Sequence, residues 1–112
     1  MNALNTYLDH TLLKADATSA DILAVTAEAK AYHTASVCVN TCFTALVARE
    51  LKGSGVKTCV VVGFPLGAMS SGAKAVEAAL VVREGAEEVD MVMSIGAAKA
   101  GDWACVQSDI AA

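Results

Sequence analysis

The stretch Thr58-Cys59-Val60-Val61-Val62-Gly63-Phe64 is a nearly continuous apolar run rich in β-branched residues. Shorter runs of the same kind occupy residues 37–39 and 89–93. Apolar runs of this length without polar alternation are typical of strands that are covered on both faces, as in parallel sheets. We therefore predict three parallel strands here and a further short strand at residues 8–11.

Helical segments separate these runs. Thr18-Ser19-Ala20-Asp21 has the spacing of a capping box, in which hydroxyl and carboxylate each serve one free N–H group. A helix is expected to begin there and to fade near Tyr32, with Ile22, Val25 and Ala29 on one face. Further helices are predicted at 44–51, at 71–84 with Val76, Leu80 and Arg83 along one face, and from the N-cap Asp102 onward with Trp103, Val106 and Ile110.

The alternation of strands and helices gives four βα units and one parallel sheet. A complete (β/α)8 TIM barrel takes about 250 residues, so four units in 112 residues are close to half of one. We expect an α/β fold in which residues 1–112 form a single (β/α)4 half-barrel domain. A flavodoxin-like open sheet, which usually has about five strands, is the competing architecture.

A half barrel leaves two strand edges and an apolar concave face uncovered. The chain is 55% hydrophobic with a mean hydropathy of +0.51, which is unusually apolar for so small a protein. We expect self-association to complete the barrel. Two copies related by a two-fold axis would keep eight strands parallel, as a homodimer or within a higher homo-oligomer.

Charge and composition narrow the possible partners. A net charge of −4 and a pI of about 4.9 argue against nucleic acid, because phosphates favour a basic face. The longest dense apolar run, residues 59–64, is shorter than the 18 or so residues of a membrane-spanning helix, so no membrane partner is expected. The N-terminus lacks the basic and apolar regions of a signal peptide, which predicts a cytoplasmic location.

The four cysteines do not indicate a metal centre. Only Cys38 and Cys42 are close in sequence, and neither histidine supplies a recognisable ligand spacing beside them. In a reducing compartment such cysteines are small apolar side chains more often than disulfide partners. We expect no metal and no cofactor.

Five motifs occur in order along the chain. They are LDHTLLK at 8–14, SVCVN at 36–40, GFPLGA at 63–68, EVDMVM at 88–93 and IGA at 95–97. Together they resemble the N-terminal half of the deoxyribose-phosphate aldolase family. The resemblance implies a class I aldolase on a (β/α)8 barrel. Such an enzyme reversibly cleaves 2-deoxyribose 5-phosphate to acetaldehyde and glyceraldehyde 3-phosphate through a lysine Schiff base.

Four residues are candidates for the site. Asp90 is an ionisable group within an apolar run. Burying such a group costs free energy, so it is expected there only when it has a partner or takes part in chemistry. The resemblance makes Asp90 the proton-relay aspartate and Asp9 an active-site aspartate after the first strand. Thr11 is close to Asp9 in sequence and is therefore a candidate to line the same pocket. The resemblance also makes Cys38 a pocket cysteine. Structural roles remain open for all four: a solvated strand-end carboxylate, a turn or N-cap residue, a structural hydroxyl and a core thiol, respectively.

The segment at residues 63–67 is a candidate for shaping that site. Two glycines and a proline after a strand predict a sharp, stiff βα turn. In a barrel such turns lie at the C-terminal face, where active sites are found. The segment lacks the Gly and Lys pattern of a nucleotide P-loop, so we do not expect it to hold a phosphate.

The resemblance also places residues beyond four βα units. It puts the Schiff-base lysine on the sixth strand, a second lysine on the seventh, and the phosphate-binding loops after the seventh and eighth. None of the eight Lys and Arg residues matches those positions. We therefore expect an aldolase half that is inactive alone and whose partner is a C-terminal half, with a sugar phosphate or aldehyde as substrate if active. The alternatives are a non-enzymatic, self-associating half-barrel scaffold and a small flavodoxin-like binding protein.

Overall fold

Four parallel strands form one sheet in the order β1-β2-β3-β4 in the computed structural model, which describes residues 3–112. The strands are β1 Asp9–Leu12, β2 Ser36–Val39, β3 Lys57–Val62 and β4 Glu88–Met91. The helices are η1 Leu4–Tyr7, α1 Ser19–Tyr32, η2 Thr41–Phe43, α2 Thr44–Leu51, α3 Ser71–Arg83, α4 Ile95–Lys99 and α5 Trp103–Ala111. The strands follow sequence order, which is the order of a barrel segment. A flavodoxin-like sheet instead reverses its order near the first strand.

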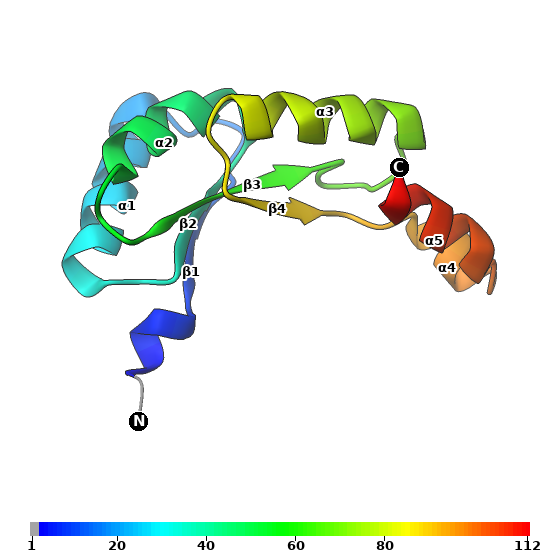
Figure 1. Cartoon of the computed structure of the whole chain (residues 1–112), viewed down its shortest axis with the longest axis horizontal. Helices are drawn as coiled ribbons and strands as arrows, with labels where there is room; N and C mark the ends of the chain where they lie inside the picture. The colour runs from blue at the N-terminus through cyan, green and yellow to red at the C-terminus, as the bar shows by residue number, and fades with distance from the viewer. Residues whose placement is uncertain (1–2) are drawn as a thin grey trace.

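The helices α1, α2 and α3 cover one face of this sheet, and no helix within residues 3–112 covers the other (Figure 1). The core between the sheet and these helices contains Ile22, Val37, Val39, Val47, Val60, Val62 and Val81, none more than 1% exposed. Among the described residues, the opposite face has only a small buried cluster, made of Cys38, Cys59 and Val61. One side of the sheet is therefore packed and the other is open.

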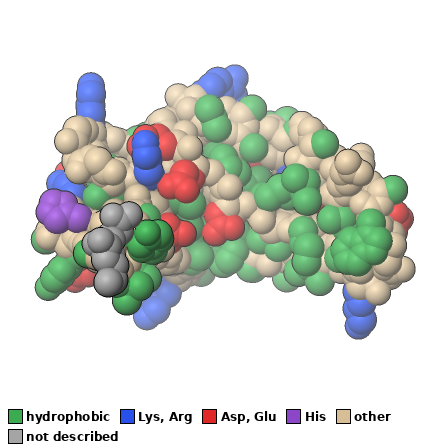
Figure 2. All heavy atoms as spheres, turned by 60° about the horizontal axis from the view of Figure 1, so that its bottom comes forward, with side chains coloured by type: hydrophobic (Ala, Val, Ile, Leu, Met, Phe, Trp, Pro, Cys, Tyr) green, Lys and Arg blue, Asp and Glu red, His purple; other side chains and the backbone are tan. Residues whose placement is uncertain are grey.

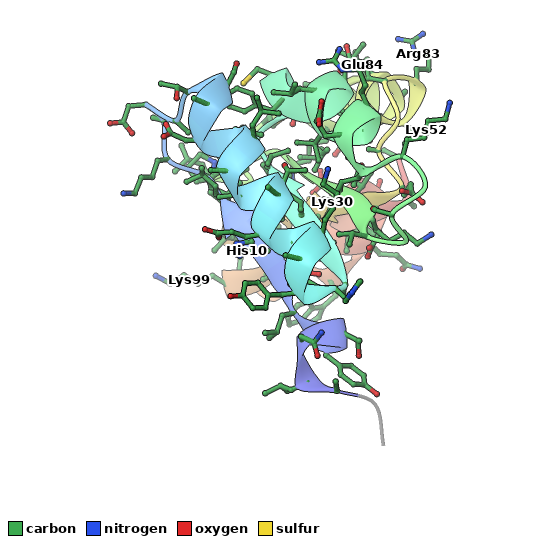
Figure 3. The ribbon with its side chains drawn as sticks, turned by 90° about the vertical axis from the view of Figure 1, so that its left-hand side faces the viewer. His10, Lys30, Lys52, Arg83, Glu84 and Lys99 are labelled. Carbon is green, nitrogen blue, oxygen red and sulfur yellow. The ribbon has the colours of Figure 1, made fainter. Side chains whose placement is uncertain are left out.

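The start of α1 confirms the predicted capping box. The Thr18 hydroxyl accepts a hydrogen bond from the Asp21 N–H at 3.3 Å, and the Asp21 carboxylate accepts one from the Thr18 N–H at 2.8 Å. Further along the helix, the Lys30 ammonium donates to the Glu50 carbonyl oxygen at 3.3 Å. Figure 3 shows Lys30 directed from α1 toward α2. This contact joins α1, which packs on β1 and β2, to α2, which packs on β3.

The helix α3 has the predicted extent, but its buried face differs from the one expected. Val76 and Leu80 are 68% and 42% exposed, whereas Lys74 is buried at 3% and Val81 at 0%. Val76 and Leu80 lie on one side of the helix, and Lys74 and Val81 lie on another. Hydrophobic periodicity favours burial of the side with two apolar residues, which is why Val76 and Leu80 were predicted to be buried. The lysine is buried because its ammonium has a buried partner on α5, while its aliphatic stem lies beside Gly63 at the end of β3.

After β4 the chain forms two short helices where one was predicted. The N-cap of α5 is Asp102, as expected, and its carboxylate accepts from the Cys105 N–H at 3.0 Å. Val106 is buried, but Trp103 and Ile110 are 65% and 57% exposed. Within residues 3–112 no helix is long and apolar enough to cross a membrane.

Candidate active site

The open face of the sheet carries all four candidate site residues. The parallel register aligns Thr11 with Cys38, Cys38 with Cys59, and Val61 with Asp90. Side chains alternate between the two faces of a strand. Because Val37, Val39 and Val60 point to the helices, Cys38 and its neighbours in register point away from them. Asp9 lies two residues before Thr11 and shares this face.

We expected Asp9 to follow the first strand. In the structure Asp9 is instead the first residue of β1. The strand begins one residue later than predicted and ends at Leu12. Asp9 Oδ1 accepts a hydrogen bond from the Ser36 hydroxyl at 2.7 Å, which ties β1 to β2. Sequence reasoning missed Ser36, although its place two residues before Cys38 puts it on the same face.

Thr11 and Cys38 are adjacent across the first two strands. The Thr11 hydroxyl donates to the Asp9 carbonyl oxygen at 2.8 Å and is otherwise exposed to solvent. Cys38 is only 3% exposed. Burial raises the pKa of its thiol, and the nearby Asp90 and Asp9 carboxylates raise it further, while a hydrogen bond with Cys59 opposes them. At neutral pH Cys38 is therefore a thiol and not a reactive thiolate.

Asp90 is the third residue of β4, and its side chain is exposed on the open face. The structure gives its carboxylate no hydrogen bond or ion pair with any of residues 3–112. Solvent hydrates this carboxylate as long as the face is open. A partner that covers the face must supply an opposite charge or hydrogen bonds in exchange.

The β3–α3 loop packs directly against the β4–α4 loop at the C-terminal edge of the sheet. The Gly63 N–H donates to Glu77 Oε1 at 2.9 Å, which holds the start of the loop on α3. Gly67 has φ +65°, and a Cβ added there would overlap the Met93 carbonyl oxygen. The predicted sharp turn is present, with a cis peptide between Phe64 and Pro65. The two loops thus form one continuous edge.

A buried ion pair behind this edge was missed by sequence reasoning. The Lys74 ammonium lies 2.6 Å from Asp109 Oδ2 and donates to the Val92 carbonyl oxygen at 3.0 Å. Asp109 also accepts from the Ser71 hydroxyl at 2.7 Å and from the Ser94 backbone N–H. The pair joins α3, α5 and the segment after β4. Its only sequence signal was the spacing of Lys74 with Ala78 and Val81 on one side of α3.

The described strands bring carboxylates and thiols to the open face but only one amine. Lys57 opens β3, and its ammonium is held 3.0 Å from the Glu87 carboxylate at the N-terminal edge. Lys74 belongs to the helix-covered side. Among residues 3–112, no group of three or more His, Cys, Asp or Glu residues is arranged to hold a metal ion. The face therefore has acids on its two edge strands and a hydroxyl and thiols between them, without a free amine among these groups.

A family model for DeoC/LacD family aldolases matches residues 4–112. The chain belongs to this family. It is 56% identical over 109 residues to a deoxyribose-phosphate aldolase of Clostridium novyi and 55% identical to one of Finegoldia magna. These matches cover 97% of this chain but 49% and 51% of the relatives, so the chain spans about half the length of the curated relatives it matches.

Solved structures described as deoxyribose-phosphate aldolases have the same architecture over this half. A crystal structure of a deoxyribose-phosphate aldolase homologue from Coccidioides immitis superposes with a TM-score of 0.92 at 34% identity. The superposition covers 96% of this chain and 42% of the Coccidioides immitis chain. The tetrameric deoxyribose phosphate aldolase of Aeropyrum pernix gives a TM-score of 0.78 at 34% identity, over 83% of this chain and 40% of that one. The four strands and their helices therefore match about half of a TIM barrel.

Proposed function

We propose that this chain is the N-terminal half of an aldolase that reversibly cleaves 2-deoxyribose 5-phosphate to acetaldehyde and glyceraldehyde 3-phosphate. The observation that carries the proposal is the match of nearly the whole chain to half of several deoxyribose-phosphate aldolases. The open face supports it, since Asp9, Thr11, Cys38 and Asp90 all lie there.

Each of these residues has a role that its position allows. Asp90, a carboxylate that pairs with none of residues 3–112, would accept and return the proton that moves during carbon–carbon cleavage. Asp9, fixed by Ser36, would hold a hydrogen-bond donor of the substrate or of a bound water. Thr11 would offer its hydroxyl to the same pocket. Cys38 would line the wall as a neutral thiol, because burial raises its pKa.

The amine nucleophile would come from the other half of the barrel. A Schiff base needs an uncharged amine beside the reacting carbonyl. Lys57 lies at the N-terminal edge in an ion pair, and Lys74 is buried against Asp109 on the helix side. We therefore expect the 112-residue chain to lack aldolase activity by itself.

The test uses borohydride trapping of the imine. The chain is treated with acetaldehyde and borohydride, alone and after co-expression with the remaining C-terminal half of the Clostridium novyi aldolase, and intact masses are recorded. We expect no specific adduct on the isolated chain. In the complex we expect an adduct on the added half and cleavage of 2-deoxyribose 5-phosphate.

Two variants sharpen this test. Asp90→Asn in the complex should lower cleavage by about 100-fold or more, since general acid–base catalysis contributes about 10²–10⁴-fold. Glu84→Gln, an exposed change at the end of α3, should leave cleavage unchanged. A complex that forms but shows neither adduct nor cleavage would overturn the proposed function, as would full activity of Asp90→Asn.

A non-enzymatic scaffold is the second candidate, and the free edges of β1 and β4 favour it. Each edge strand presents unpaired backbone groups that a second copy would satisfy. This candidate predicts a stable homo-oligomer that forms no imine. Native mass, recorded on the same sample as the trapping experiment, distinguishes it from an aldolase half that awaits its partner.

A further inference from the structure

The carboxylates of the open face lie at its two borders. Asp9 is on β1, and Glu88 and Asp90 are on β4, which are the two edge strands of the sheet. Apart from Lys57 at the N-terminal edge of β3, the central strands present uncharged side chains to this face, namely Ser36, Cys38, Cys59 and Val61. Figure 2, which turns the open side forward, shows acidic side chains gathered near the middle of this view. Any partner that extends the sheet thus meets carboxylates first.

Positive charge is scarce on the same surface. Lys57 is the one Lys or Arg within the four described strands, and it lies at the N-terminal edge beside Glu87. His10 is also on β1, but it alternates with Asp9 and Thr11 and pairs at 2.8 Å with Glu28 on α1. Neither cation reaches Asp90, near the other end of β4.

Electrostatic repulsion would oppose the pairing of a second copy of this chain with the two edge strands. A parallel eight-stranded closure sets β4 of one copy beside β1 of the other, at both junctions. Neighbouring strands lie about 4.8 Å apart. Glu88 and Asp90 of one copy would then stand beside Asp9 of the other, and like charges that face each other across strands are destabilising. Closing the barrel also removes water, which strengthens the repulsion.

We propose that Asp9, Glu88 and Asp90 select the partner that completes this sheet: they exclude a second copy and admit a half barrel whose inward side chains are positively charged. The inference rests on the proposed function only for the source of that half. Relatives twice as long as this chain contain a further segment of suitable length. In the completed barrel, Asp9 and Asp90 would gain opposite charges that residues 3–112 do not provide, whereas Glu88 already has Lys57 near it.

Self-association of charge variants tests the exclusion. The variant Asp9→Asn/Glu88→Gln/Asp90→Asn removes the border charges with nearly unchanged shapes. The control Asp16→Asn/Glu50→Gln/Glu84→Gln removes as many charges elsewhere on the surface. Sedimentation equilibrium at neutral pH should show a monomeric wild type and control. The border variant should self-associate at least about 100-fold more tightly, because juxtaposed like charges are costly at interfaces.

A second variant keeps the test decisive if the triple change unfolds the protein. Asp90→Lys alters one exposed side chain and gives β4 the charge that β1 of a second copy would attract. It should also self-associate, with far-UV circular dichroism confirming that it is folded. A wild type that dimerises as tightly as the border variant would overturn the proposal, as would a control that gains as much as that variant.

Copurification with the C-terminal half of another aldolase tests this inference separately from the proposed function. The co-expressed C-terminal half of the Clostridium novyi aldolase should copurify with the wild type and at least about tenfold less with Asp90→Lys, since the interior charges then repel. Equal recovery of both would overturn the partner selection even if the complex cleaves 2-deoxyribose 5-phosphate. If the C-terminal half copurifies with the wild type and much less with Asp90→Lys, but the complex does not cleave 2-deoxyribose 5-phosphate, only the proposed function is overturned.

Discussion

Lys74 on α3 and Asp109 on α5 form an ion pair with an Nζ–Oδ2 distance of 2.6 Å, and their side chains are 3% and 4% exposed. Ser71, Ser94 and the Val92 carbonyl complete the hydrogen bonding of both groups. The last helix therefore docks through a satisfied polar contact in addition to apolar packing. Removal of one charge leaves the other buried without its partner.

We predict that Lys74→Met lowers the free energy of unfolding by about 3–5 kcal/mol, the usual cost of leaving one member of a buried pair alone. The paired change Lys74→Met/Asp109→Leu should recover most of this loss, because it removes both charges. Urea unfolding followed by circular dichroism measures both values. A double variant as unstable as the single one would show that the lysine stem, not the charge pairing, stabilises the contact.

The same pair predicts an acid-dependent stability. Hydrogen bonds from Lys74 and Ser71 hold the pKa of Asp109 below its ordinary value of 3.8. The ionised form is thus favoured by folding, so the stabilisation is fully present above the ordinary pKa and is lost as the pH falls through the folded value. Urea midpoints of wild type and Asp109→Asn should differ most near neutral pH and converge toward pH 2. A difference independent of pH would contradict this assignment.

The approach of Gly67 to Met93 predicts unequal costs for two glycine substitutions. Gly53→Ala has φ +77° and open space around the new Cβ, so it should cost about 1–2 kcal/mol from the left-handed backbone alone. Gly67→Ala adds an overlap with the Met93 carbonyl and should cost about 3 kcal/mol or more. Urea unfolding compares the two variants. Equal costs would mean that the two loops separate easily.

The cysteines should react with iodoacetamide in an order set by exposure and by pKa. Cys42 and Cys105 are exposed, whereas burial raises the pKa of Cys38 and raises that of Cys59 to about 12. At pH 8 the exposed pair should be labelled at least about tenfold faster, since the thiolate is the reactive form. Mass mapping of the modified peptides measures this order, and unfolded protein in urea should lose it. Fast labelling of Cys38 in the folded chain would contradict its assignment as a neutral wall residue.

Local signals account for the parts of the fold that the sequence predicted well. The apolar runs became β2, β3 and β4, and the caps Thr18 and Asp102 begin their helices, because both signals act within a few residues. Missed boundaries, such as the end of β4 at Met91, reflect apolar residues that continue past the last ladder hydrogen bonds. The five-residue helix α4 contains Gly96 and is too short to give a periodic pattern.

Long-range contacts account for the parts that it did not predict. The buried face of α3 depends on Asp109, 35 residues after Lys74. The candidate site was identified residue by residue, but its shared face required the register that aligns Thr11 with Cys38 and Val61 with Asp90. The concentration of carboxylates on the edge strands also became visible only with the strand order. These features depend on contacts between residues that are far apart in sequence, and local patterns in a single sequence do not reveal such contacts.

The unpaired edge of β4 has a consequence for protein synthesis. In a relative of twice this length, the first half leaves the ribosome while the second, roughly as long, takes about 5–20 s to be made at about 5–20 residues per second. During that interval neighbouring nascent chains on one messenger expose identical edges at high local concentration. Carboxylates on those edges would keep the waiting halves apart until each meets the remainder of its own polypeptide.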